Sequence, residues 1–246
     1  MSSRELKDII ADIDVSGIVK RSMRSELEKS GLSSALSSGA VNESYVATPK
    51  TYSQVTEYLS QKSKDAHVNL YKAAIESLNR VSAELDGVDV SKASANHSSF
   101  RSLKLDETFL LNSTWLHEVH FAGSFDPHST IYMDSAAYIE LERTWGTFDD
   151  WQREFLGCAM SCGNGWAVLG FNVFLKRYVN TMISNDSQDV MVGLIPIIAL
   201  DMHEHAYSRD YLSDKRSYAV AMLKTLNWET IEERFNRCKA IAQVLK

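Results

Sequence analysis

The sequence is poor in helix-breaking residues and in cysteine. Only three prolines and eleven glycines occur in 246 residues, and because both residue types interrupt helices, long helices are expected. The three cysteines, at positions 158, 162 and 238, are an odd number that cannot build a disulfide framework. Since secreted domains tend to pair their cysteines, the sequence predicts a reducing, cytoplasmic location.

Long apolar runs and an excess of basic residues are also missing. No stretch approaches the roughly 18 uninterrupted apolar residues that a membrane-spanning helix needs, and the opening MSSRELKDII mixes charges where a signal peptide has an apolar run. Against 26 Lys and Arg stand 32 Asp and Glu, which gives no basic footprint for nucleic acid. We therefore expect neither a membrane nor a nucleic-acid partner. The composition, 44% apolar and 24% charged, is that of a globular protein.

The N-terminal half of the chain is predicted to be helical. Residues 1–50 form an extension, with a short helix over 4–28 and then a linker rich in Ser, Gly and Asn. Residues 51–125 form a hairpin domain of two antiparallel helices. The first runs from about residue 59 to the turn at 86–87, and the second from about 106 to 121.

The residue pattern changes along the remaining segment, residues 126–246. Two helical segments come first, and Thr147 is placed to cap the second of them. Runs of β-branched and aromatic residues follow and predict buried strands, after which the pattern returns to helix. The expected segments are helices over 134–146 and 147–162, strands within 166–183 and 190–202, and helices from about 213 onward. The predicted fold class is α+β: an antiparallel helical hairpin followed by a domain of helices and a small antiparallel sheet.

The sharpest chemical feature is an acidic residue and a histidine just beyond a very apolar strand. Asp201 and His205 are four residues apart after Ile195–Leu200. At a strand-to-helix junction this spacing lets both side chains converge on one point. A cluster of imidazole and carboxylate without thiolate suits iron, manganese or zinc. The alternative interpretation is two surface residues at the start of a helix.

The surroundings of this pair point to a known family. The segment IPIIALDMHEHAY, residues 195–207, resembles the signature of the iron/manganese superoxide dismutases. Further matches, such as Trp145-Gly146 upstream and Asn227-Trp228 downstream, extend the resemblance over residues 59–235. It implies one iron or manganese ion per chain, held by one histidine from each hairpin helix together with Asp201 and His205.

The resemblance leaves two candidates for the ligand of the second helix. His117 stands two residues after Trp115, as the family pattern has it. His97, within Asn96-His97-Ser98, resembles another form of the motif but follows the hairpin turn too soon to come level with the first helix. We favour His117, because 84 residues separate it from Asp201, close to the family spacing.

Two registers compete on the first helix. In one, Ser60 caps the helix and His67 is the ligand. In the other, Ser63 falls on the ligand position, and His67 and Tyr71 line the substrate funnel. The capping pattern favours the first register, with Tyr71 one turn beyond the ligand as a residue of the funnel.

The resemblance implies two further roles. Asn185 stands where the sheet of the family supplies a glutamine that hydrogen-bonds the metal-bound solvent, and Ser113 occupies the alternative helix position. Glu204 is expected to cross a two-fold interface and hold His205 of a second chain, which predicts a homodimer.

Two functions are compatible with these residues. The first is dismutation of superoxide to oxygen and hydrogen peroxide by a redox-cycling iron or manganese ion. The alternative is a superoxide dismutase-like structural subunit of a larger assembly, such as a virion or a ribosome, docked through residues 1–50. The choice between iron and manganese depends on tuning by surrounding residues and on metal supply, so it stays open.

Overall fold

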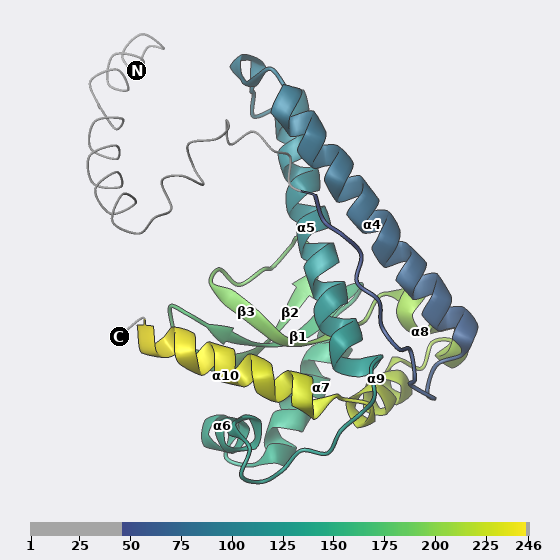
Figure 1. The fold of residues 1–246 in the computed structure, drawn as a ribbon, viewed down its shortest axis with the longest axis vertical. Coiled ribbons are helices and arrows are strands. Elements are labelled where there is room, and N and C mark those ends of the chain that lie inside the picture. Colours follow the sequence, from purple (N-terminus) through teal and green to yellow (C-terminus); the bar gives the residue numbers. More distant parts are fainter. Residues whose placement is uncertain (1–45, 245–246) are drawn as a thin grey trace, which may run out of the picture. The chain divides into compact units, whose positions relative to one another are not determined.

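The computed structural model describes residues 46–244, and Figure 1 shows their arrangement. The expected helix over residues 4–28 lies outside the described residues. A long helical hairpin, α4 and α5, stands against a small sheet, and shorter helices cover the opposite side of that sheet (Figure 1). This is the α+β class predicted from the sequence.

The hairpin is bounded by serine caps. Helix α4 (Gln61–Gly87) begins after Ser60, whose side chain accepts a hydrogen bond from the backbone N–H of Ser63, as the sequence predicts. Helix α5 (Ser99–Ser124) begins after Ser98, which caps in the same way. A short 3-10 turn, Val90–Lys92, lies between the two helices.

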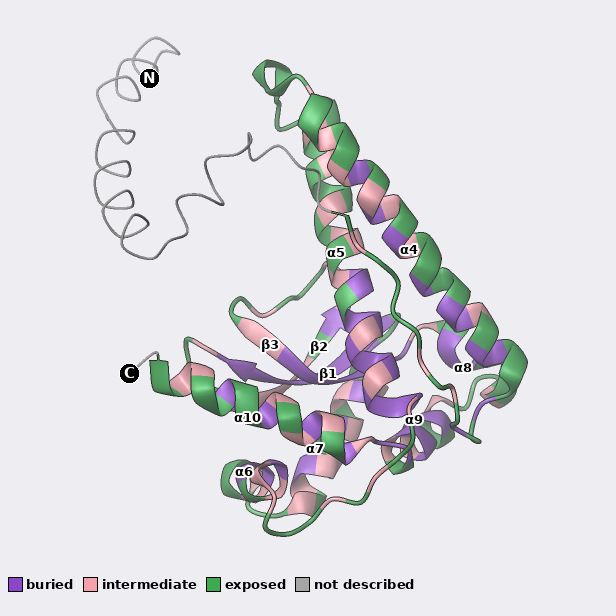
Figure 2. Cartoon of the chain, viewed as in Figure 1, coloured by how far each residue is buried: buried purple, intermediate pink, exposed green. Residues whose placement is uncertain are grey.

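The predicted start of the second helix, near residue 106, is wrong. Helix α5 begins seven residues earlier because the hydroxyl of Ser98 accepts from the N–H of Arg101 at 3.2 Å and starts a turn there. The residues at the tip of the hairpin are mostly exposed, as Figure 2 shows. They therefore lack the apolar periodicity by which a buried helix is recognised.

The C-terminal part alternates helices with one three-stranded sheet. Its helices and strands are α6 (Ala136–Trp145), α7 (Phe148–Ser161), β1 (Gly165–Asn172), β2 (Arg177–Ser184), β3 (Leu194–Asp201), α8 (Glu204–Tyr211), α9 (Lys215–Lys224) and α10 (Trp228–Val244). Thr147 caps α7 as predicted, since its side chain accepts from the N–H of Asp150. The sequence analysis placed Asp201 and His205 at a strand-to-helix junction and expected further helix from about residue 213, but it gave no bounds for α8.

The sheet is antiparallel, with strand order β2-β1-β3. All eight residues of the central strand β1 are buried, because both of its faces are covered. Trp166 and Val168 pack with residues of α5 on one face, and Leu169 and Phe171 belong to the larger core on the other. In register, Trp166 pairs with Asp201, so β1 aligns the end of β3 beneath the hairpin.

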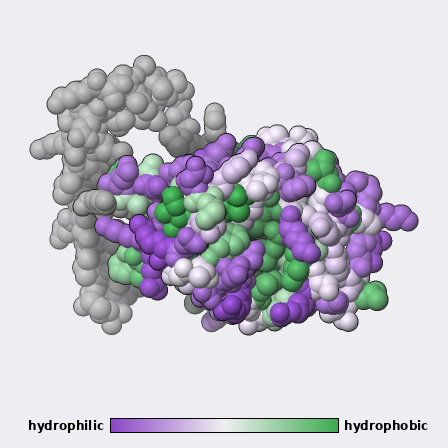
Figure 3. Space-filling view, turned by 90° about the horizontal axis from the view of Figure 1, so that it is seen from below, coloured by the Kyte–Doolittle hydropathy of each residue, from purple (hydrophilic) through white to green (hydrophobic). Residues whose placement is uncertain are grey.

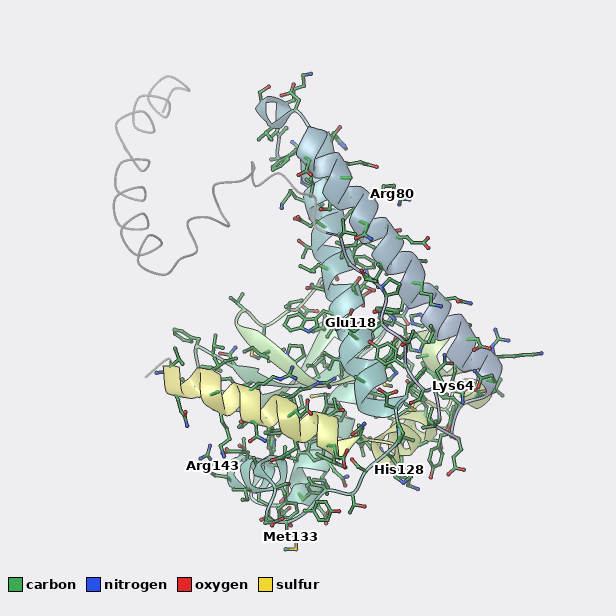
Figure 4. The ribbon with its side chains drawn as sticks, viewed as in Figure 1. Lys64, Arg80, Glu118, His128, Met133 and Arg143 are labelled. Carbon is green, nitrogen blue, oxygen red and sulfur yellow. The ribbon has the colours of Figure 1, made fainter. Side chains whose placement is uncertain are left out.

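Residues 46–60 form an extended arm along the hairpin (Figure 1). The side-chain amide of Asn79 pairs with the backbone N–H and carbonyl of Ala47. Farther along, the N–H of Val55 donates to the carbonyl of Phe125 at 2.9 Å. Lys64, at the lower end of α4 in Figure 4, donates to the carbonyls of Gln54 and Thr56. These bonds tie the arm to both hairpin helices.

The surface viewed from below carries several separate groups of hydrophobic residues among hydrophilic ones (Figure 3). Single exposed apolar side chains are ordinary on folded proteins. Within residues 46–244, none of the helices combines the length and the apolar character needed to cross a bilayer.

Candidate metal centre

Four side chains from four different elements converge beside the lower half of the hairpin. Oδ2 of Asp201, at the end of β3, lies 2.9 Å from Nε2 of His67 on α4 and 3.0 Å from Nε2 of His205 on α8. It lies 3.7 Å from Nε2 of His117 on α5. Each of the four residues offers one ligand atom, and these four atoms all lie within 4.8 Å of one another. The four residues that the family resemblance implied as ligands are thus brought together.

The two residues of each ligand alternative lie in different places. Ser63 is buried next to its capping partner Ser60, whereas His67, one turn on, reaches Asp201. His97 is exposed before the start of α5 and has a φ of +45°. His117 lies inside α5 and faces the cluster. The cluster thus contains His67 and His117, and it contains neither Ser63 nor His97.

The protonation of the three buried groups, His67, His117 and Asp201, suits a cation. Burial lowers the pKa of His67, and burial together with neighbouring His67 lowers the pKa of His117 to about 3. Burial alone would raise the pKa of the Asp201 carboxyl, but hydrogen bonds from His203, His205 and His67 hold it well below its usual range. Neutral imidazoles and an ionised carboxylate are the forms that bind metals.

His117 gives the clearest test of whether these residues fit a metal ion. Its Nδ1–H donates to the carbonyl of Ser113 at 2.7 Å, which leaves the lone pair on Nε2. That Nε2 atom is buried and has no hydrogen-bond partner among residues 46–244. A metal-bound imidazole commonly donates its other N–H to a carbonyl or carboxylate in this way. The donor set, three imidazole nitrogens and one carboxylate oxygen, fits iron or manganese.

The other carboxylate oxygen of Asp201, Oδ1, is held by His203. Oδ1 accepts hydrogen bonds from the backbone N–H and from Nδ1–H of His203, both at 2.8 Å. The ring of His203 stacks on that of His205, with centroids 5.1 Å apart and planes 11° apart. Burial lowers the pKa of His203, but Asp201 and Asp186 outweigh burial and raise it.

Access from solvent is uneven around the cluster. The side chains of His67, His117 and Asp201 are at most 4% exposed, whereas that of His205 is 33% exposed. The cluster therefore opens on the side of His205. Glu204, which precedes His205 at the start of α8, is exposed as well.

Tyr71 and Asn185 lie in different environments. Tyr71 is fully buried, and its ring centroid is 6.3 Å from that of His117. Its hydroxyl accepts from the backbone N–H of Lys50 and donates to Glu118, each at 3.0 Å; Glu118 is labelled on α5 in Figure 4. Asn185 is exposed, in the turn after β2.

Two residues next to the cluster were not among the predicted site residues. His120, one turn after His117, is fully buried and donates Nδ1–H to the carbonyl of Ala199. Its Nε2 has no partner in the part of the chain that the structure describes. Asp186 is buried beside Asn185 and accepts a hydrogen bond from the indole N–H of Trp166. The spacing of His120 from His117 is a signal that both face one side of α5. No periodic signal marks Asp186, which lies in a turn.

Comparison with known proteins identifies the family. A superoxide dismutase [Fe] of Aquifex pyrophilus is 33% identical over 182 residues, which are 74% of this chain and 84% of that protein. The chain belongs to the iron/manganese superoxide dismutase family. A superoxide dismutase [Fe] of Cupriavidus metallidurans is 34% identical over 72% of this chain and 88% of its own length. A superoxide dismutase [Mn] of Mycobacterium leprae is 24% identical over 75% and 88%.

A family model described as iron/manganese superoxide dismutases, C-terminal domain, matches residues 134–234. This segment contains Asp201, the last residue of β3, and His205 on α8. The hairpin ligands His67 and His117 lie upstream of it, so their assignment rests on the cluster geometry.

Proposed function

We propose that this chain dismutates superoxide, converting two superoxide ions and two protons to oxygen and hydrogen peroxide, at a centre held by His67, His117, Asp201 and His205. The observation that carries the proposal is the compact set of four ligand atoms with the buried, unpartnered Nε2 of His117. An iron or manganese ion bound there supplies one-electron oxidation and one-electron reduction of superoxide.

The protein's own part is to hold, shield and orient the ligands. The carboxylate of Asp201 carries the one formal negative charge among the four ligand side chains, and burial keeps the imidazoles of His67 and His117 neutral. The carbonyl of Ser113 and the side chain of His203 fix the orientation of His117 and Asp201. The partly exposed edge of His205 leaves an approach for a small anion.

We retain Tyr71 and Asn185 as proposed residues of the reaction. Burial and the nearby carboxylate of Glu118 raise the pKa of Tyr71. Its hydroxyl therefore stays protonated and donates a hydrogen bond to Glu118. That hydrogen bond holds a proton one helical turn beyond His67. The exposed amide of Asn185 is available to solvent or to an incoming anion. Tyr71→Phe and Asn185→Ala, each assayed at equal metal content, test the two roles.

The remaining expectations concern organisation, assembly and location. We propose a hairpin domain over residues 51–125 and an α+β domain over 126–246, because each supplies two of the four ligands. We also propose a homodimer in which Glu204 contacts the partner's His205, since both residues lie on the open side of the cluster. The free thiols of Cys158, Cys162 and Cys238 support a reducing, cytoplasmic compartment.

The decisive experiment is reconstitution. The purified chain is loaded with iron or with manganese, its metal content is measured, and dismutation is compared with that of the free ion. We expect one ion per chain and activity well above the free ion, with either metal tested separately. Metal-loaded protein without such activity would overturn the proposal. Protein that takes up neither metal would favour the alternative, a structural subunit of a larger assembly.

A further inference from the structure

The turn after β2 places a buried carboxylate beside the metal centre. Asp186 is 5% exposed, although Asn185 and Asp189 in the same loop are exposed. All three residues have a positive φ, of +57°, +46° and +62° for Asp186, Asn185 and Asp189. Asn and Asp tolerate this left-handed conformation better than other side chains. The backbone of the turn therefore directs Asp186 inward.

Three contacts fix Asp186. Its Oδ1 accepts a hydrogen bond from the indole N–H of Trp166 and lies 3.9 Å from Nε2 of His203. Its backbone carbonyl accepts from the side-chain amide of Asn112 on α5 at 2.9 Å. The carboxylate is thus held between the hairpin and the sheet.

Both side-chain partners of Asp186 touch metal ligands. The indole of Trp166 meets the ring of His117 edge to face, with centroids 4.9 Å apart and planes at 83°. His203 donates Nδ1–H to Asp201 at 2.8 Å. Two separate routes, Asp186–Trp166–His117 and Asp186–His203–Asp201, therefore lead from this carboxylate to the ligand cluster.

The carboxylate of Asp186 lies 3.9 Å from Nε2 of His203, whose ring stacks on that of His205. Charges in a buried environment are screened less than in water, and a fixed negative charge stabilises a trivalent ion more than a divalent one. The sequence led us to expect a neutral amide, Asn185, from this loop. The buried group is a carboxylate instead.

We propose that Asp186 is a positioning residue of the metal centre: it holds Trp166 against His117 and His203 against Asp201, and its negative charge favours the higher oxidation state of the bound ion. The charge effect rests on the proposed function, because it needs a redox-active metal. The positioning effect does not, because the contacts exist without the ion.

The test uses Asp186→Asn with Asp189→Asn as its matched control. Both changes remove one negative charge from the same loop and leave a residue that tolerates positive φ. Asp186→Asn keeps a carbonyl oxygen that can accept from Trp166. Asp189 is exposed, so its replacement reports the effect of a surface charge alone.

The first readout is the indole ¹⁵N–¹H NMR spectrum of the metal-free protein. The chain has five tryptophans, and the signal of Trp166 is assigned by its loss in Trp166→Phe or by sequential assignment. We expect this signal to shift upfield in Asp186→Asn, because a neutral oxygen is a weaker acceptor than a carboxylate. It should stay in place in Asp189→Asn. An unmoved Trp166 signal in Asp186→Asn overturns the positioning role.

The second readout is the midpoint reduction potential of the metal-loaded protein. We expect a more positive potential in Asp186→Asn and an unchanged one in Asp189→Asn. Equal potentials for the wild type and Asp186→Asn, or equal shifts in both variants, overturn the charge effect. A chain that binds no redox-active metal refutes the proposed function and the charge effect that depends on it, while the NMR result still decides the positioning role.

Discussion

Oδ2 of Asp201 lies 2.9 Å from Nε2 of His67, although 134 residues separate them in the chain. The contact joins the last residue of β3 to the second turn of α4. His117 and His205 complete the group from α5 and α8. The fold therefore assembles the centre only when the hairpin and the sheet are packed together.

The first prediction is that Asp201→Ala strongly weakens metal binding. The change removes the only carboxylate ligand and leaves three imidazoles around the vacated position. Replacing a residue that only hydrogen-bonds a metal ligand lowers metal affinity by up to about 100-fold. Because Asp201 is itself a proposed ligand, we expect its loss to lower metal affinity by more than that. Metal analysis after loading and dialysis measures this.

His97→Ala is the matched control for this loss. His97 is exposed, lies before α5 and is absent from the cluster, so its variant should bind metal like the wild type. A large loss in His97→Ala, or full metal content in Asp201→Ala, would contradict the ligand assignment.

The second prediction concerns Gly165, where the chain enters β1. A Cβ at this position would lie 2.1 Å from the carbonyl oxygen of Ile183 on the paired strand, and its φ is +155°. We expect Gly165→Ala to lower the free energy of unfolding by roughly 3 kcal/mol, because the two strands must separate to admit the methyl group.

Gly157→Ala on α7 serves as the comparison in denaturant unfolding. A Cβ there meets nothing within 4 Å, and alanine is favoured over glycine inside a helix by about 0.5–1 kcal/mol. This variant should be as stable as the wild type or more so. Similar unfolding midpoints for the two variants would show that the contact at Gly165 is relieved without cost.

The third prediction is a pH dependence of the metal-free protein. Burial and neighbouring His67 lower the pKa of His120 to about 3, from about 6.5 in an unfolded chain. Between these values the unfolded state binds the proton and the folded state does not. Stability should therefore fall as the pH falls from 6.5 toward 3, by about 1.4 kcal/mol per pH unit for this one group.

His120→Phe tests the contribution of this residue. The variant keeps an aromatic ring but cannot be protonated, so the slope of unfolding free energy against pH should decrease. It should not vanish, because His117 has a lowered pKa too and remains. The loss of the hydrogen bond to Ala199 lowers stability at every pH and does not affect the slope. An unchanged slope would rule out His120 as a source of acid sensitivity.

Local patterns and the family resemblance predicted the main features of the site. The spacing of Asp201 and His205 after an apolar run indicated a shared point at the end of a strand, and Ser60 marked the start of α4 correctly. His67 and His117 were predictable from motif positions on their helices, but periodicity alone gave no distance between them. The start of α5 was missed because residues at an exposed tip carry no apolar period.

The residues that surround the ligands were harder to predict. Asp186 enters the core because consecutive residues of its turn adopt left-handed conformations, and a turn has no repeating pattern that tells which side chain points inward. His203 reaches Oδ1 of Asp201 because the chain turns between β3 and α8. Such orientations depend on backbone dihedral angles, whereas sequence patterns chiefly report burial.

The last prediction concerns Glu204 and assembly. Glu204 is exposed at the start of α8, beside the partly exposed His205, on the open side of the cluster. A carboxylate that accepts the second N–H of a metal-bound imidazole fixes its ring and raises its basicity. If a second chain supplies this carboxylate, two-fold symmetry makes the contact reciprocal. We therefore expect Glu204→Ala to weaken the dimer and to lower metal affinity together, the latter by about 10- to 100-fold.

Sedimentation and metal analysis on the same samples separate this role from a general effect of lost charge. Glu84→Ala provides the control, because Glu84 is exposed on α4, seventeen residues beyond the ligand His67. That variant should keep both the dimer and its metal. A wild-type protein that sediments as a monomer at micromolar concentration contradicts the proposed interface. If Glu204 both stabilises the dimer and holds the partner's His205, its removal should lower dimer stability and metal content together. Full metal content in a Glu204→Ala protein would therefore show that His205 needs no carboxylate from a partner.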